Sequence, residues 1–167
     1  MSRTQNLIEV IKWNRTRTLG TLEAIEKLPN PQEALAFRPG PGRAHIGWQL
    51  MHIGITEEVF ATERLAPEKQ RPFEDLWPRF RGGSTPDDDI PAAADIRRVL
   101  GETREHLLET LAAFDDSRLG ETPASLPDRM KAMNFTMLDV LHIIAWHEGH
   151  HQGQAHLTLN LYKARQV

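Results

Sequence analysis

Five of the eight histidines lie between positions 142 and 156, and this group is the part of the sequence best suited to chemistry. Histidine is the commonest metal ligand in proteins and the usual acid–base group near neutral pH. His147 and His151 are four residues apart, so on a helix their rings share one face, about 40° and one turn apart. At that spacing two imidazoles can bind a single ion, although such pairs also occur on helix surfaces and in protein cores where other groups satisfy their hydrogen bonds.

A third histidine, His52, shares an apolar helical stripe with Trp48 and Ile55, so it is expected to point into the interior. A buried imidazole without a partner costs about 1–3 kcal/mol, and a divalent cation shared by all three rings removes that cost. Three histidine ligands leave coordination positions open for water or substrate, as catalytic sites do and closed structural zinc sites do not. The sequence therefore predicts a metal site of His52, His147 and His151, although periodicity gives no distance between His52 and the other two.

Other polar residues near these histidines have weaker assignments. Glu148 and His150 are the nearest candidate proton carriers, with a plain exposed position as the alternative for His150. His45 lies on the His52 face nearer the start of its helix and is expected not to be a ligand. The remaining histidines are expected to face solvent or an interface: His106, His142 and His156. Imidazole suits zinc, nickel, copper and iron, so the ligand set does not fix the metal.

Residues 147–151 read HEGHH and satisfy the H-E-x-x-H pattern of zinc proteases, in which two histidines bind zinc and the glutamate activates water. Such proteases normally take a third ligand from downstream. The 16 residues after His151 contain no Asp or Glu, and His156 falls on the opposite helix face. The pattern of the sheet that usually precedes such a helix is also missing. A protease is therefore disfavoured.

Four segments with helical periodicity position these residues: 2–28, 44–65, 92–114 and 134–164, the last beginning at Asn134 or Thr136. Proline and glycine gather mainly between them, and no segment alternates apolar and polar residues as a half-buried strand does. We therefore predict an all-α protein, a four-helix bundle, with residues 1–167 forming one domain. About 26 residues separate the second and third segments, far more than a tight antiparallel turn needs, which indicates a long crossover between parallel helices.

The composition argues against several classes of function. The 167 residues include 20 Lys and Arg against 23 Asp and Glu, a formal net charge of -3, which argues against a nucleic-acid-binding surface. The chain has no cysteine, which rules out disulfides, thiolate metal ligands and a cysteine nucleophile. There is no run of about 18 apolar residues, so no membrane span is predicted and a cytoplasmic location is expected.

Three segments carry a resemblance to a known family. LHIIAWHEGHHQGQ (141–154) resembles the last-helix signature of the DinB/YfiT-like superfamily, where H-x-x-x-H is followed by R-G-Q. AHIGWQLMHIGITEE (44–58) resembles its second-helix element, and the loop RGGSTPDDDIP (81–91) also looks familial. One departure is that Gln152 replaces the usual arginine, while Gly153 and Gln154 keep the pattern. Any anion contact made by that arginine is therefore left open.

The resemblance implies a four-helix bundle with up-down-down-up order. It also implies a divalent metal, commonly nickel or zinc, bound by three histidines that correspond here to His52, His147 and His151. Family members are often dimers. Several are transferases or isomerases that depend on bacillithiol, mycothiol or glutathione, and many others are only assumed to be metal-dependent hydrolases.

Two reactions on a small-molecule substrate follow from such a site: hydrolysis, or nucleophilic transfer by a low-molecular-weight thiol. Because the chain has no cysteine, the thiol must come from outside it. The alternative is a non-catalytic, stress-related metal-binding dimer whose ion only ties two helices together. Gly149 and Gly153, with Ala145, form a small-residue face that suits a neighbouring helix or a second subunit, and we expect a homodimer.

Overall fold

A computed structural model describes residues 2–123 and 125–166 of the chain. Within these ranges the regular structure is entirely helical, which confirms the predicted all-α class. None of the described helices is both long and apolar enough to cross a membrane. The elements in chain order are α1 (Arg3–Glu26), α2 (Pro31–Ala36), α3 (Ile46–Val59), the π-helical η1 (Phe60–Leu65), the 3₁₀ helix η2 (Glu74–Leu76), α4 (Trp77–Phe80), α5 (Ala93–Ala112), the 3₁₀ helix η3 (Asp116–Gly120), α6 (Asp128–Ala132) and α7 (Met137–Ala164).

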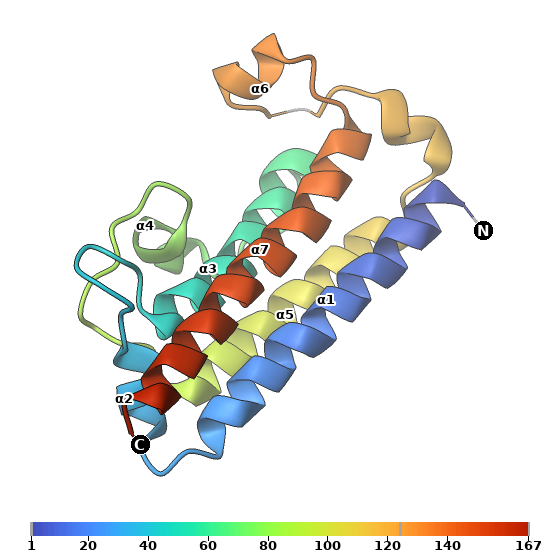
Figure 1. Cartoon of the computed structure of the whole chain (residues 1–167). Helices are drawn as coiled ribbons and strands as arrows, with labels where there is room; N and C mark the ends of the chain where they lie inside the picture. Colours follow the sequence, from blue (N-terminus) through green and yellow to red (C-terminus); the bar gives the residue numbers. More distant parts are fainter. Residues whose placement is uncertain (1, 124, 167) are drawn as a thin grey trace.

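The long helices α1, α3, α5 and α7 lie side by side (Figure 1). Helix α1 packs against α7 and α5, and α3 packs against α5 and α7. The short helices α2 and α4 lie toward the end of the molecule where the C-terminus is found, and α6 lies at the opposite end (Figure 1). The four predicted segments correspond to the long helices, whereas the short helices in the connections between them were not predicted.

Side-chain caps fix where three of the long helices begin. Ser2 accepts a hydrogen bond from the backbone of the first turn of α1. Helix α7 begins with a reciprocal capping box between Thr136 and Asp139. Helix α3 is capped by His45, whose Nδ1 accepts from the backbone N–H of Trp48 at 3.0 Å. The ring of His45 therefore serves a helix terminus.

Two apolar clusters fill the interior along the long helices. One gathers mainly around α3 and α5, and the other joins the first half of α1, η1, the second half of α5 and the first half of α7. Helices α3 and α5 approach closely because Gly54 has no side chain. A Cβ at Gly54 would lie 2.8 Å from Cγ1 of Val99, a distance that real side chains do not adopt. This close packing fixes the position of α3, which carries His52.

Four buried charges join the four long helices near the middle of the molecule. Arg15 of α1 and Arg104 of α5 both contact the carboxylates of Glu57 of α3 and Glu148 of α7. All four side chains are at most 8% exposed, and the two positive and two negative charges balance. Because each helix contributes one charge, this cluster holds α3 and α7 in a fixed relative position.

Candidate metal centre

The three predicted ligands meet between α3 and α7. His52 is buried, while His147 and His151 are partly exposed. One ring nitrogen from each residue lies within 4.8 Å of the other two. Nε2 of His52 and Nε2 of His147 are 3.0 Å apart, and the ring centroids of His52 and His151 are 4.5 Å apart. The distance that periodicity left open is therefore short, and the three rings form one group, called here the histidine group.

Hydrogen bonds fix the orientation of two of the rings. Nδ1 of His52 lies 2.6 Å from the carbonyl oxygen of Phe80, and Nδ1 of His151 lies 2.6 Å from Oε1 of Gln49. Both partners are acceptors, so each Nδ1 carries the proton and donates it. The Nε2 atom of each ring then has a free lone pair. Metal-binding histidines are held by this kind of outer hydrogen bond, which fixes both the tautomer and the ring.

The histidine group is held neutral by its surroundings. Burial, followed by the neighbouring His52 and His151, lowers the pKa of His147 from 6.5 to about 2. Burial, followed by the neighbouring His52 and His150, lowers the pKa of His151 to about 4. Burial also lowers the pKa of His52. Near neutral pH all three imidazoles are therefore uncharged, which is the form that binds a metal ion.

The spacing within the histidine group fits a divalent cation. Two nitrogens about 2.1 Å from an ion lie about 3.0 Å apart at a right angle and about 3.4 Å apart at a tetrahedral angle. The 3.0 Å between Nε2 of His52 and Nε2 of His147 falls in this range. With the proton of His147 on Nδ1, the Nε2 atoms of His52 and His147 would both present lone pairs to a shared ion.

Residues outside the group hold His52 in place from two sides. The indole of Trp48 stacks on its ring, with centroids 4.5 Å apart and an interplanar angle of 14°, and Nε1 of Trp48 donates to the carbonyl of Arg79 at 2.9 Å. The segment carrying the Phe80 carbonyl is anchored by Glu58. The buried carboxylate of Glu58 accepts from the Trp77 indole at 2.6 Å and from the backbone of the preceding loop. Burial raises the pKa of Glu58.

The two candidate proton carriers lie outside the histidine group. Both carboxylate oxygens of Glu148 are engaged: Oε1 accepts from Arg15 and Thr18 at 2.7 and 2.8 Å, and Oε2 accepts from Arg104. Glu148 therefore belongs to the buried charge cluster. His150 is exposed, and its ring stacks on Trp146 with centroids 4.9 Å apart. Its ring also lies 4.9 Å from the ring of His151, at the edge of the group.

The other residues singled out in the sequence lie elsewhere. His106, whose pKa burial lowers, belongs to α5, and His142 is exposed. His156 Nδ1 lies 3.5 Å from Oγ1 of Thr21 on α1, and Nε2 of Gln152 donates to the same hydroxyl at 3.1 Å. Gln152 therefore contacts α1. On the small-residue face, Gly149 lies near Asn14 of α1, whereas a Cβ at Gly153 would meet nothing within 4 Å.

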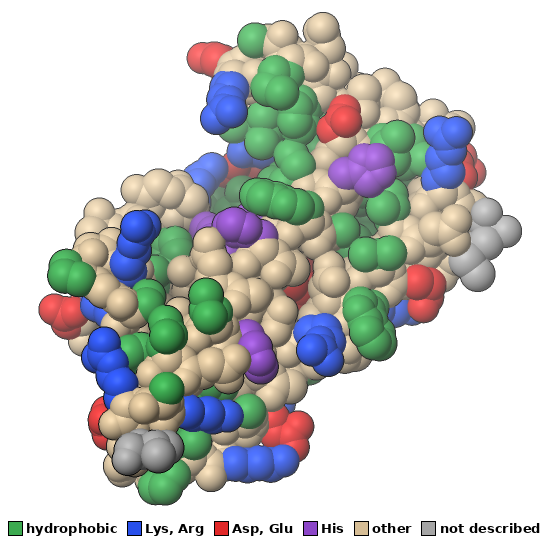
Figure 2. Space-filling view, viewed as in Figure 1, with side chains coloured by type: hydrophobic (Ala, Val, Ile, Leu, Met, Phe, Trp, Pro, Cys, Tyr) green, Lys and Arg blue, Asp and Glu red, His purple; other side chains and the backbone are tan. Residues whose placement is uncertain are grey.

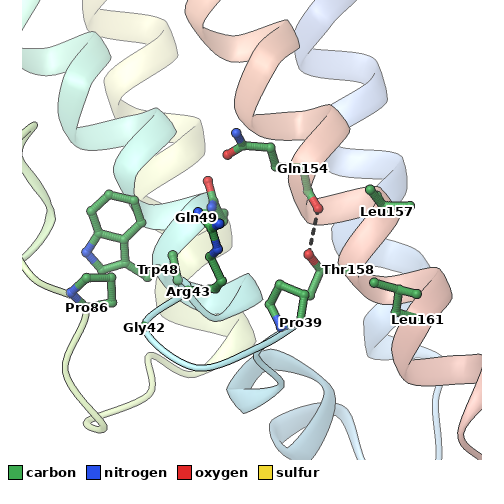
Figure 3. A pocket seen from close by; sticks show the side chains of 11 residues that line it. Pro39, Gly42, Arg43, Trp48, Gln49, Pro86, Gln154, Leu157, Thr158 and Leu161 are labelled. Atoms are coloured by element: carbon green, nitrogen blue, oxygen red, sulfur yellow. Dashed lines mark hydrogen bonds between the residues drawn. The ribbon is translucent and has the colours of Figure 1, made fainter.

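Two cavities lie along the bundle on either side of the histidine group. One, of about 420 Å³, is lined by His52 and His147 and by residues from η1 and the region of α6. The other, of about 400 Å³, is lined by Trp48 and Gln49 of α3, which face residues 154–161 of α7 (Figure 3). Figure 2 shows histidine side chains at the surface of the face viewed, and His147 and His151 are themselves partly exposed. A small molecule therefore has room beside the group.

The fold and the histidine group together define a helical protein with a candidate three-histidine metal centre. The chain belongs to the DinB superfamily, whose family model matches residues 11–155, and the resemblance seen in the sequence is thereby confirmed. A comparison with curated proteins found no match.

Proposed function

We propose that this DinB-superfamily protein binds a divalent metal ion, nickel or zinc, through His52, His147 and His151 and uses it in catalysis on a small molecule. The observation that carries the proposal is the pair of Nδ1–H bonds, from His52 to the Phe80 carbonyl and from His151 to Gln49. These bonds leave lone pairs on the Nε2 atoms, which is the arrangement that a shared cation requires. The cavity bordered by His52 and His147 supports catalysis, because a purely structural ion is normally enclosed.

The chemistry in question is hydrolysis or transfer of a low-molecular-weight thiol. A divalent cation supplies Lewis acidity, which lowers the pKa of a bound nucleophile and polarises an acceptor group. The chain itself contributes orientation. The Phe80 carbonyl and Gln49 hold the rings of His52 and His151, and Trp48 stacks on the ring of His52. A thiol nucleophile has to be an external compound such as bacillithiol, mycothiol or glutathione, because the chain has no cysteine.

The deciding experiment compares metal content, thermal stability and turnover of the wild type and His147→Ala. We expect the wild type to retain close to one equivalent of nickel or zinc after dialysis, and the variant to retain little. Incubation of the metal-loaded protein with small thiols and an electrophile, and separately with esters, distinguishes transferase from hydrolase. Equal metal content in the wild type and the variant would refute the proposed metal site. Bound metal without turnover on either substrate set favours the non-catalytic dimer.

We also propose that the long helices form the up-down-down-up bundle expected from the family. In support, α1 and α7 run in one direction and α3 and α5 in the other in Figure 1, and the long connection over residues 66–92 joins the parallel pair. A homodimer is proposed from the exposed Trp13 of α1 and Trp146 of α7, which are 65% and 62% exposed. Light scattering of the wild type and a Trp13→Ser/Trp146→Ser variant tests the dimer.

A further inference from the structure

The cavity of about 420 Å³ beside the histidine group is lined by two arginines and by apolar side chains, and this lining suits one chemical class of ligand. We propose that it binds a small organic acid, with the carboxylate held by Arg64 and Arg81 and an apolar body against the opposite wall. This inference rests on the proposed function in one respect: if His52 and His147 bind a catalytic metal ion, an acid in this cavity lies beside that ion, as a substrate must. The volume is in the range of ordinary small-molecule sites.

The charge of the cavity is positive. Outside the histidine group, the charged side chains among the described residues that line it are those of Arg64 and Arg81. The two guanidinium groups share one carboxylate, Glu63, which lies 3.2 Å from Arg64 and 2.9 Å from Arg81. Two cations and one anion leave a net charge of about one positive unit at the wall, which an anionic ligand would neutralise.

The two arginines differ in how firmly they are held. The side chain of Arg64 is 8% exposed, and its NH1 donates to the backbone carbonyl and the hydroxyl of Ser125 at 2.8 and 3.1 Å. Arg81 is 43% exposed, stacks over the Trp77 ring at 5.3 Å, and among the described residues has Glu63 as its one side-chain acceptor. Arg81 therefore keeps donors free for a carboxylate, which guanidinium groups bind well because of their planar geometry.

The rest of the cavity is apolar. Five of its lining side chains carry no polar atom able to form a strong hydrogen bond: Val59, Phe60, Pro127, Met130 and Ile143. The wall formed by Phe60 and Arg64 belongs to η1, where the backbone is π-helical, a form that is common at functional sites. An acid with an apolar body thus finds a cation at one end and apolar surface along its length.

The test uses two acids, hexanoate and 3-phenylpropanoate, and their neutral amides as probes. Isothermal titration calorimetry is carried out on the metal-free and the zinc-loaded full-length protein. We expect the acids to bind both forms of the wild type and the amides to bind at least tenfold more weakly. Arg81→Gln should weaken acid binding at least tenfold without changing zinc content. The matched control is Arg43→Gln, which removes an exposed arginine from the other cavity and should leave acid binding unchanged.

Several outcomes overturn the inference. They are equal affinity for acids and amides, equal effects of Arg81→Gln and Arg43→Gln, or no binding of either acid at millimolar concentration. Binding to the zinc-loaded protein alone, unaffected by Arg81→Gln, would mean that the metal holds the acid without the arginines. The proposed function fails by a different measurement, namely retention of zinc by His147→Ala. A failure of one proposal is therefore distinguishable from a failure of the other.

Discussion

Replacement of Glu148 by alanine separates a structural from a catalytic role for this residue. Glu148 is 4% exposed and contacts Arg15 and Arg104, which are 7% and 8% exposed. Removing one partner from a buried ion pair costs about 3–5 kcal/mol, because a charge is left buried without compensation. Here Glu57 still contacts both arginines, so we expect a loss near the lower end, about 3 kcal/mol. For a chain of this size that corresponds to a fall in Tm of roughly 6–12 °C.

The assay is urea unfolding of the metal-free protein, followed by metal titration of the folded variant. The control is Glu26→Ala, which breaks an ion pair with Arg97 whose side chains are 29% and 45% exposed. Exposed pairs contribute about 0–1 kcal/mol, so this variant should unfold almost as the wild type does. The reasoning is refuted if Glu148→Ala keeps the full free energy of unfolding and binds metal normally but loses turnover. Glu148 would then be the proton carrier suggested by the sequence.

Three further predictions concern the same helices. Gln49→Leu removes the acceptor of the His151 Nδ1–H bond, so metal affinity measured by chelator competition should fall roughly 10–100-fold while the fold persists. The folded pKa values of His147 and His151, about 2 and about 4, lie below the unfolded value of 6.5, so the unfolded state binds more protons as pH falls. The metal-free protein should therefore be most stable above pH 6.5 and should lose up to about 1.4 kcal/mol per pH unit for each of the two histidines below it, measured by urea unfolding. Gly54→Ala should lower the free energy of unfolding by about 1–3 kcal/mol, because the added Cβ overpacks against α5. Gly101→Ala adds a Cβ in open space within a helix, so it should raise the free energy of unfolding by up to about 1 kcal/mol in the same assay.

Much of the helical framework was predictable, because apolar residues recur at helical spacing in each long segment. The predicted segment 92–114 compares with α5 at Ala93–Ala112, and 134–164 compares with α7 at Met137–Ala164. The segment 44–65 covers α3 and η1, but helical periodicity cannot reveal that residues 60–65 form a π-helix. A change in residues per turn alters which side chains share a face, and Arg64 was not predicted at the cavity for this reason.

The buried charge cluster was missed although the sequence contains a signal for it. Arg15 lies four residues after Ile11 and Arg104 lies four residues after Leu100, so each occupies an inward position of an apolar stripe. Charges of opposite sign at such positions on different helices indicate a buried pair. The Phe80 carbonyl is different, because any residue type offers a backbone oxygen and no pattern of side chains marks it. Gln49, three residues before His52, was detectable as a polar residue near the inward face.

The histidine group depends on the contact between α3 and α7 more than on either helix alone. His52 comes from α3, while the ring of His151 on α7 is oriented by Gln49, which is again on α3. Glu57 and Glu148 fix the same two helices through shared arginines. A ligand that binds the folded state alone stabilises it by RT ln(1 + [L]/Kd), about 4 kcal/mol at a thousandfold excess over Kd. The proposed metal binding is therefore expected to be coupled to folding, and a change that separates α3 from α7 is expected to weaken both together.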